Sequence, residues 1–384
     1  MSSNLNIEKI KKEKSGIDVL ADIFFHAVFG EKISPENLER IKWYGVYAQD
    51  EKQEFFKLKI PLSMGELNLI QLKTLSTISK KYSNNSLTFS SEQKIEFLDI
   101  KIFDLPNIFN LLQEVKLNTY FEAGHTVRRV LTCPVNGIDD SQLFDVEPLA
   151  NKLNETFIGN KNFDNLPNKL QFAISGYEEG CNVQFIPDVS FNAAIDAKDK
   201  IIFAIKILDN HIGFITPSLV VKTAISIANI YKDFGNREKL ENSSFEYLVK
   251  NWGLNKFSDI LNSTVNNKIQ RNLETKQNPK ARKPRMGINE SKIQGQSYIG
   301  CKLDFKILQS SDLDDLTLLL EKYTASKIKV THKANIIILD APTENAKEFA
   351  NLPLEKLELL SDDILAGIVL SFLNNFGLLE NNKN

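Results

Sequence analysis

The sequence predicts an α+β fold in which one small unit of helices and strands occurs twice, on either side of a longer α+β region. An internal repeat is the first observation behind this prediction: residues 71–100 align with residues 312–341 without a gap, and Tyr82 meets Tyr323. The second observation is that similar strand-like and helix-like segments flank both copies. With 384 residues, the chain has room for two or three domains with buried cores.

Each copy of the repeat is predicted to contain a helix, a polar turn and a strand. Both helices carry apolar residues at spacings of three on one face, namely Leu72, Leu75 and Ile78 in the first copy and Leu313, Leu316 and Leu319 in the second. A strand is expected before each helix, at 55–62 and 297–305, and a second helix after each strand, at 104–117 and 345–357. Two such halves are expected to pair across a pseudo-two-fold axis.

The region between the copies is predicted to form a larger α+β domain. Strands and turns are expected at 123–138, 166–176, 183–195 and 200–208. Helices are expected at 218–235 and 237–253, because apolar residues recur there with helical spacing.

Composition excludes several classes of protein and partner. The formal net charge of −2 predicts no nucleic-acid or membrane partner, and the basic segment 280–285 (KARKPR) is either a solvated connector or a docking site for an acidic partner. No run reaches the roughly eighteen apolar residues of a membrane span, and the N-terminus lacks a secretory signal, so we expect a cytoplasmic location. Cys133, Cys181 and Cys301 are too far apart for a disulfide framework or a zinc ribbon.

Several short motifs occur in a fixed order along the chain. They are RIKWYGVYAQ at 40–49, TVRRVLTCPVNGI at 126–138, LPNKLQFAISG at 166–176 and GNREKLENSSFEYLVKNWG at 235–253. In sequence, order and spacing, they resemble motifs of the siroheme-dependent nitrite and sulfite reductases, in particular the ferredoxin–nitrite reductases of cyanobacterial type. The resemblance extends over nearly the whole chain.

The resemblance implies two ferredoxin-like half-domains and one siroheme-type nitrite/sulfite reductase domain, with the second such domain missing. Active members of the family bind siroheme beside a four-iron, four-sulfur cluster and deliver six electrons to nitrite or sulfite. We accordingly expect an N-terminal helical segment, a first half-domain, a siroheme-type domain, a linker, a second half-domain and a remnant of the second siroheme-type domain, at residues 1–48, 49–118, 119–268, 269–291, 292–360 and 361–384.

The family's cluster ligands are not found at the matching positions of this chain. The first two cluster cysteines correspond to Ser371 and Gly377 in the segment GIVLSFLNNFG. Serine is a far weaker iron ligand than a thiolate and glycine has no side chain, so we expect no iron–sulfur cluster. These replacements predict a C-terminally truncated, degenerate paralogue of a ferredoxin–nitrite reductase.

In this family, arginine and lysine surround the substrate anion. Arg128 and Lys169 occupy two such positions and Lys333 matches an arginine in the second repeat, so these three are the candidate contacts for siroheme or an anion. Glu92 stands where the family has an arginine, and its carboxylate is expected to repel nitrite and the acid groups of siroheme. Other positions that match or depart from the family pattern are Arg129, Asn168, Gln171, Ile207, Leu208, Ser244, Glu246 and Asn335.

Two interpretations of the retained cations stay open. Arg128 and Lys169 are either structural residues that pair with carboxylates or contacts of a tetrapyrrole or anion. His125 lies near Arg128 in sequence, and a lone histidine of this kind is more often hydrogen-bonded in the fold than a metal or haem ligand.

Three functions are compatible with this sequence. The leading hypothesis is a non-catalytic accessory protein of nitrite assimilation, which carries siroheme to a ferredoxin–nitrite reductase or pairs with it. The alternative is an active ferredoxin-dependent nitrite or sulfite reductase variant that binds siroheme through Arg128, Lys169 and Lys333 without its own cluster. The third is a cofactor-free binding module. An exposed half-domain face would favour a homo-oligomer or a complex with the reductase.

Overall fold

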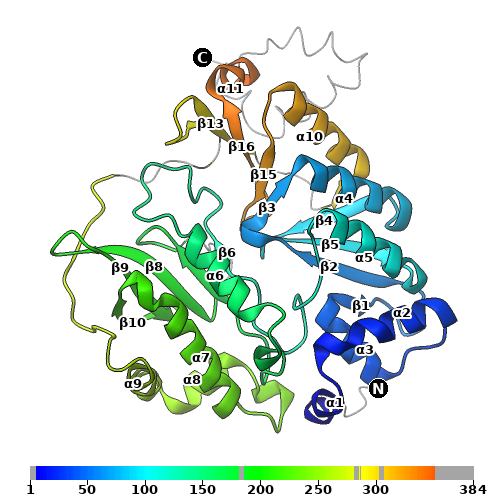
Figure 1. Cartoon of the computed structure of the whole chain (residues 1–384), viewed down its shortest axis with the longest axis horizontal. Coiled ribbons are helices and arrows are strands. Elements are labelled where there is room, and N and C mark those ends of the chain that lie inside the picture. The colour runs from blue at the N-terminus through cyan, green and yellow to red at the C-terminus, as the bar shows by residue number, and fades with distance from the viewer. Residues whose placement is uncertain (1–5, 181–185, 281–284, 286, 302–306, 351–384) are drawn as a thin grey trace.

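Two five-stranded sheets of the same topology form the right-hand and upper parts of the molecule (Figure 1). The computed structural model describes residues 6–180, 186–280, 285, 287–301 and 307–350. The first sheet has the order β1 (Val46–Ala48), β2 (Phe56–Pro61), β5 (Lys94–Ile100), β4 (Ser86–Ser90) and β14 (Ile307–Gln309). The second has the order β12 (Gly287–Glu290), β13 (Gln296–Cys301), β16 (Ile336–Pro342), β15 (Lys327–Val330) and β3 (Glu66–Asn68).

The last strand of each sheet comes from the other copy of the repeat. β3 precedes the first repeat helix but pairs with β15, with Leu67 opposite Ile328. β14 precedes the second repeat helix but pairs with β4, with Leu308 opposite Leu87. Both pairs are antiparallel, and they join the two halves reciprocally. The repeat predicts that the halves pair, but the exchange of strands between them is a feature that the sequence did not predict.

The two repeat helices lie next to each other on one side of these sheets (Figure 1). These helices, α4 (Leu69–Tyr82) and α10 (Ser310–Lys322), begin with a capping box at equivalent positions, Asn68 with Gln71 and Gln309 with Asp312. Ser76 of α4 donates a hydrogen bond to Asp314 of α10 at 2.5 Å. The predicted apolar faces of both helices are buried against the shared core.

The segment predicted to be a polar turn in each repeat contains a strand. In the first copy this strand is β4, where Leu87 and Phe89 point into the core and the residues between them are half-buried. In the second copy it is β15. In β4 the alternation of buried and half-buried residues is only five residues long and begins directly after two asparagines. The prediction therefore assigned these residues to the turn. Each half-domain therefore has three strands, a helix, two strands and a second helix in chain order, and it ends in α5 (Leu105–Glu114) or α11 (Thr343–Ala350).

The middle of the chain forms a third sheet at the lower left of Figure 1. Its order is β10 (Asn210–Ile215), β9 (Ile201–Ile207), β8 (Val189–Asp196), β7 (Phe172–Ser175) and β6 (Leu131–Thr132). β6, β7 and β8 are parallel, and the remaining pairs are antiparallel. The accompanying helices are α6 (Glu147–Phe157), α7 (Val220–Phe234), α8 (Phe245–Trp252) and α9 (Leu254–Thr264). Phe157, Phe172 and Phe191 stack through its core.

The segment that we expected to be a linker contains two short strands. β11 (Thr275–Lys276) pairs with β8 of the middle sheet. β12 pairs with β13 of the second half-domain. The polar composition that suggested a solvated connector is compatible with strands at the edges of sheets, because their outward side chains meet water.

Three N-terminal helices pack beside the first half-domain and the middle domain (Figure 1). They are α1 (Ile7–Glu13), α2 (Leu20–Phe29) and α3 (Pro35–Ile41). Lys11 of α1 donates to Leu166 O at 2.8 Å, and Glu8 forms an ion pair with Arg237 at 2.8 Å. These contacts fasten α1 to the middle domain. None of the helices in the described residues combines the length and apolar character that crossing a membrane requires.

Candidate functional site

Two hairpin tips, one from each half-domain, meet the middle domain at Thr132. Gln93 in the β4–β5 turn accepts from Thr132 N at 3.4 Å and donates to Val330 O at 3.0 Å. His332 in the β15–β16 turn donates from Nε2 to Thr132 O at 2.9 Å. Gln93 and Ala334, at equivalent positions of the two turns, both have a φ of 57°. The two similar turns of the repeat thus both contact Thr132 in β6 of the middle sheet.

Glu92, at one of these tips, belongs to a cluster of charged side chains. Lys94, on the same hairpin, forms ion pairs with both Glu92 and Glu122. The Lys94 side chain is 8% exposed, the Glu122 side chain 1% and the Glu92 side chain 33%. We call Glu92, Lys94, Glu122 and Arg128 the charge cluster. It contains two acids and two bases, so its charges balance.

The electrostatics of Glu92 follow from this pairing. Burial acts to raise its pKa, but the nearby ammonium groups of Lys94, Lys169 and Lys59 outweigh it, and the pKa lies below its ordinary value. Glu92 is therefore ionised at neutral pH. The position at which the resemblance predicts a cation therefore holds an anion here.

Arg128 is held by the loop that leads into it. Its Nη1 donates to Ala123 O at 3.2 Å and Thr126 O at 3.3 Å, and its Nη2 donates to Gly124 O at 2.8 Å. Burial lowers the pKa of Arg128, opposed by Glu122, Tyr47, Glu92 and Asp188. Both terminal nitrogens are thus committed to carbonyl groups of the protein itself, so the structure favours the structural interpretation of this arginine.

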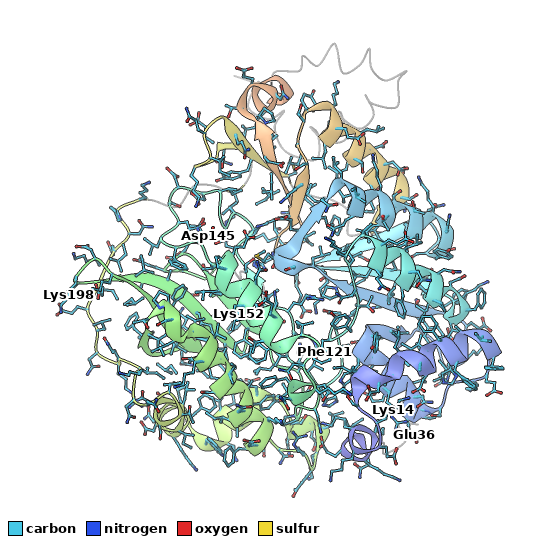
Figure 2. The ribbon with its side chains drawn as sticks, viewed as in Figure 1. Lys14, Glu36, Phe121, Asp145, Lys152 and Lys198 are labelled. Atoms are coloured by element: carbon cyan, nitrogen blue, oxygen red, sulfur yellow. The ribbon has the colours of Figure 1, made fainter. Side chains whose placement is uncertain are left out.

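Gly124 allows that loop to approach Trp43 closely. Its φ is 73°, and a Cβ at this position would lie 2.3 Å from the indole ring of Trp43. Phe121 N donates to Trp43 O at 2.7 Å. In Figure 2, Phe121 lies between α6 and the N-terminal helices, at the start of the loop. Gly124 and these contacts place Glu122 and Arg128 opposite the hairpin tip.

Lys169 lies at the edge of the charge cluster. Arg128 N donates to Leu170 O at 2.9 Å, which puts Lys169 beside the arginine segment. The Lys169 side chain is exposed. Asp188 is its second acidic neighbour: burial raises the pKa of Asp188 to about 6, although the Gln171 N–H, at 2.8 Å, and Lys169 oppose this shift. Lys169 is therefore flanked by two carboxylates.

Lys333 is not brought into the charge cluster by any ion pair among the described residues. It lies at the tip of the β15–β16 hairpin, in the position equivalent to Glu92, and its side chain is exposed. Its backbone N–H donates to the Thr331 hydroxyl of the same turn at 3.2 Å. Of the three predicted contacts, only Arg128 and Lys169 lie together.

Three other positions of the family pattern, Gln171, Asn168 and Ser244, have roles in the fold. Gln171 donates to Arg129 O at 2.8 Å and to Phe172 O at 2.9 Å. Asn168 donates to the Ser243 hydroxyl at 3.0 Å. Ser244 caps α8 by accepting from Tyr247 N at 3.1 Å.

Three further predicted positions are also accounted for by packing or hydrogen bonding. Ile207 is fully buried in the core of the middle domain, and Leu208 packs against that core. His125 Nδ1 donates to Pro167 O at 2.7 Å, and the imidazole stacks on Trp43. Burial lowers the pKa of His125 to about 4, so the ring is neutral at pH 7. This histidine is satisfied within the fold.

Two of the three cysteines lie within the described residues, and both are fully buried. Burial strongly raises the pKa of the Cys301 thiol, which disfavours the thiolate that a metal needs. In the part of the chain that the structure describes, no group of three His, Cys, Asp or Glu side chains could hold a metal ion. Ser371, Gly377 and Cys181 lie outside the described residues.

Sequence reasoning missed Lys94 and Glu122, which complete the charge cluster. Lys94 could have been found, because it lies two residues from Glu92 on the same hairpin and offers it a positive charge. Glu122 gives no local signal. It reaches Lys94 only because the loop after α5 returns to the β4–β5 hairpin.

A separate cleft of about 530 Å³ lies between α2 and α5. Aromatic side chains from both sides line it, including Phe24, Tyr44, Phe109 and Tyr120. Its lining contains no residue of the charge cluster. The cleft is therefore distinct from the site that the family pattern predicts.

Two family models match this chain. The model described as the nitrite and sulphite reductase 4Fe-4S domain matches residues 123–269. The model described as the nitrite/sulfite reductase ferredoxin-like half domain matches residues 47–115, which include the first repeat helix. The charge cluster draws Glu92 and Lys94 from the second matched region and Arg128 from the first.

Curated relatives of this chain are nitrite and sulfite reductases. The assimilatory ferredoxin-dependent nitrite reductase of Haloferax mediterranei is 24% identical over 379 residues, covering 87% of this chain and 64% of the relative. The ferredoxin–nitrite reductase of Synechococcus elongatus is 23% identical over 365 residues, covering 87% of this chain and 69% of the relative. The chain thus spans about two thirds of the length of these relatives.

A solved structure has the same fold. The structure of the Mycobacterium tuberculosis NirA protein superimposes with a TM-score of 0.80 at 21% sequence identity, covering 98% of this chain and 70% of that protein. At this level of identity the similarity establishes the α+β architecture.

Proposed function

Because the chain belongs to the nitrite and sulfite reductase family, whose models match residues 47–115 and 123–269, we propose that it serves nitrite assimilation as a non-catalytic accessory to a ferredoxin–nitrite reductase. The relatives named above supply the pathway and the partner in this proposal. The charge cluster supplies the reason why the chain does not itself reduce nitrite.

One observation supports the non-catalytic role most strongly. At the place where the family pattern puts cations around an anion, Lys94 is already paired with Glu92 and Glu122. Adding nitrite or sulfite there would place it beside two carboxylates in a poorly solvated environment, where repulsion between like charges is strong. The cluster therefore disfavours the substrate that the family reduces.

The described residues also do not fit siroheme in the family manner. Siroheme carries several carboxylate side chains, which need cations with free donors. The terminal nitrogens of Arg128 donate to carbonyl groups at 2.8 to 3.3 Å, and Lys94 is shared by two carboxylates. The charge balance of this cluster leaves no surplus positive charge for an acidic cofactor.

A second candidate function has one observation in its favour. Lys169 and Lys333 are solvent-exposed lysines at positions where the family pattern has cations. In a reductase variant that takes siroheme from solution, these two side chains would be the first to meet its carboxylates. This candidate predicts a coloured protein, whereas the accessory function without siroheme predicts a colourless one.

Spectroscopy and turnover together test the proposal. The full chain is produced in cells that make siroheme, and its visible spectrum is recorded. Nitrite and sulfite reduction are then assayed with dithionite-reduced methyl viologen, with a ferredoxin–nitrite reductase as the positive control. We expect no Soret band and no ammonium or sulfide above the background. Siroheme bands together with turnover would establish the reductase variant instead.

The accessory role is tested separately with the reductase of the same cell. Mixtures of the two proteins are examined by sedimentation velocity, and the nitrite turnover of the reductase is measured with and without this chain. We expect a complex of the two proteins and a changed kcat or KM for nitrite. Independent sedimentation with unchanged kinetics would contradict the accessory role.

A further inference from the structure

Glu122 is the most deeply buried acid of the charge cluster. Its side chain is 1% exposed, and Oε2 has no hydrogen-bond partner among the described residues. Among those residues its one ionic partner is Lys94, which it shares with Glu92. A buried carboxylate with an oxygen left unbonded is costly, so its presence beside Lys94 calls for an explanation.

Two basic side chains belong to the surroundings of Glu122. Lys94 forms an ion pair with it, and the Glu122 carboxylate acts to raise the pKa of Arg128 against the effect of burial. Tyr47, from β1, is half-buried, and its pKa responds to the same three charged groups. A small anion placed beside Lys94 would be stabilised by the ammonium group, if Glu122 were not there.

The shape of a carboxylate explains why Glu122 can fill this position. A carboxylate and a nitrite ion are both bent, three-atom, singly charged groups with two oxygens at the ends. Both can accept hydrogen bonds and ion pairs from the same cations. A glutamate whose carboxylate lies where a small oxyanion would bind can therefore take the place of that oxyanion.

We propose that Glu122 is a built-in counter-anion, which occupies the position that a small oxyanion of the nitrite or formate type would take beside Lys94. The inference rests on the proposed function, since it explains why a family member with this buried cation would not take up nitrite. Glu92 has a lesser role, because its side chain is one third exposed and water already screens its charge.

Removal of the carboxylate tests this inference by chemical rescue. Glu122→Ala leaves a cavity beside Lys94 that formate or nitrite can enter. The melting temperature of E122A is measured against formate and against nitrite, with chloride holding the ionic strength constant. We expect E122A to melt several degrees below the wild type in chloride and to regain at least half of that loss, saturably, in either oxyanion.

Two control variants separate a specific site from a general salt effect. Glu96→Ala removes a carboxylate from β5, the strand that contains Lys94, where it pairs with Lys57 at 3.5 Å and Lys59 at 3.2 Å. It should show no saturable response to formate or nitrite. The double variant K94M/E122A lacks the cation, so it should also fail to respond.

Every result of this experiment decides the question. If E122A folds only when formate or nitrite is present, the inference is supported. If it folds but responds no more than E96A, or folds in none of the salts, the inference is overturned. The turnover assay and the sedimentation experiment use the wild-type chain and are independent of this outcome, so failure of the accessory role and failure of the counter-anion can be told apart.

Discussion

Asp188 shows how a single carboxyl group beside the charge cluster affects stability. Burial raises its pKa to about 6, so the native state prefers the protonated form. The protonated carboxyl group stabilises the native state, and this contribution is complete below the unfolded pKa of about 4. It is lost as the pH rises through 6, and it is absent at neutral pH. At pH 7 the fold therefore retains a buried negative charge at a cost.

Replacement of Asp188 by asparagine should remove that cost. We expect D188N to be more stable than the wild type at pH 7 by about 1–3 kcal/mol, with the difference vanishing near pH 4. The amide oxygen can still accept from Gln171 N, which the carboxylate accepts at 2.8 Å. Urea denaturation of both proteins between pH 4 and 8 measures the effect.

Asp196 provides a control with the opposite sign. Its carboxylate accepts from the N–H groups of Lys200 and Lys198, both at 2.8 Å, and these bonds lower its pKa. The ionised form stabilises the native state above the unfolded pKa, so D196N should not gain stability at neutral pH. An equal gain in D188N and D196N would contradict the role of burial at Asp188.

At the scale of elements, the exchanged strands β3 and β14 make the two half-domains depend on each other. Each strand is short, and its hydrogen-bonding partner belongs to the other repeat. Leu67 of β3 is fully buried in a core that contains residues of both repeats. A defect in β3 should therefore appear in the half-domain to which β3 does not belong by sequence.

Leu67→Ala is the substitution that tests this dependence. Loss of a fully buried leucine should lower the free energy of unfolding by about 2–5 kcal/mol. We also expect faster amide hydrogen exchange in β15, whose Ile328 lies opposite Leu67. Leu318→Ala, at a side chain that is 47% exposed on α10, is the control and should change stability by less than about 0.5 kcal/mol. Unchanged exchange in β15 would rule out the proposed dependence.

The repeat could be predicted from sequence because its signals are local. Helical spacing of leucines and the matched tyrosines identified both copies, and the structure confirms their similar folds. The strands β4 and β15 were missed because turn residues precede them. The strand exchange could not be predicted, since three residues such as Glu66–Asn68 carry no information about which sheet they join.

At the scale of the whole molecule, Gln93 connects three parts of the chain. It belongs to the first half-domain, donates to Val330 O of the second and accepts from Thr132 N of the middle domain. Its side chain is buried. A single amide group thus satisfies backbone groups of two other parts, and it lies beside the charge cluster at the neighbouring positions Glu92 and Lys94.

Loss of this amide should reduce the cooperativity of unfolding. Gln93→Ala leaves buried backbone groups without partners, which should cost about 1–3 kcal/mol. Trp43, near the N-terminal helices, and Trp252, in the middle domain, report on different parts by fluorescence. We expect their urea transitions to separate in Q93A and to coincide in the control Q113A, which alters an exposed helix position. Coincident transitions in Q93A would show that the contact is dispensable for coupling.

The sequence by itself determined the α+β class, the duplicated half-domain and the family resemblance, and it predicted that Glu92 stands at a position where the family pattern has a cation. These depend on residue types and on spacings within a few turns or strands, where periodicity and motif order act directly. Only the tertiary structure shows which charged side chains pair with Glu92 and with its partner. Its partner Lys94 is shared with Glu122, and a loop that returns after α5 brings that acid to the hairpin. Electrostatic balance depends on distance in space, which sequence separation does not reveal.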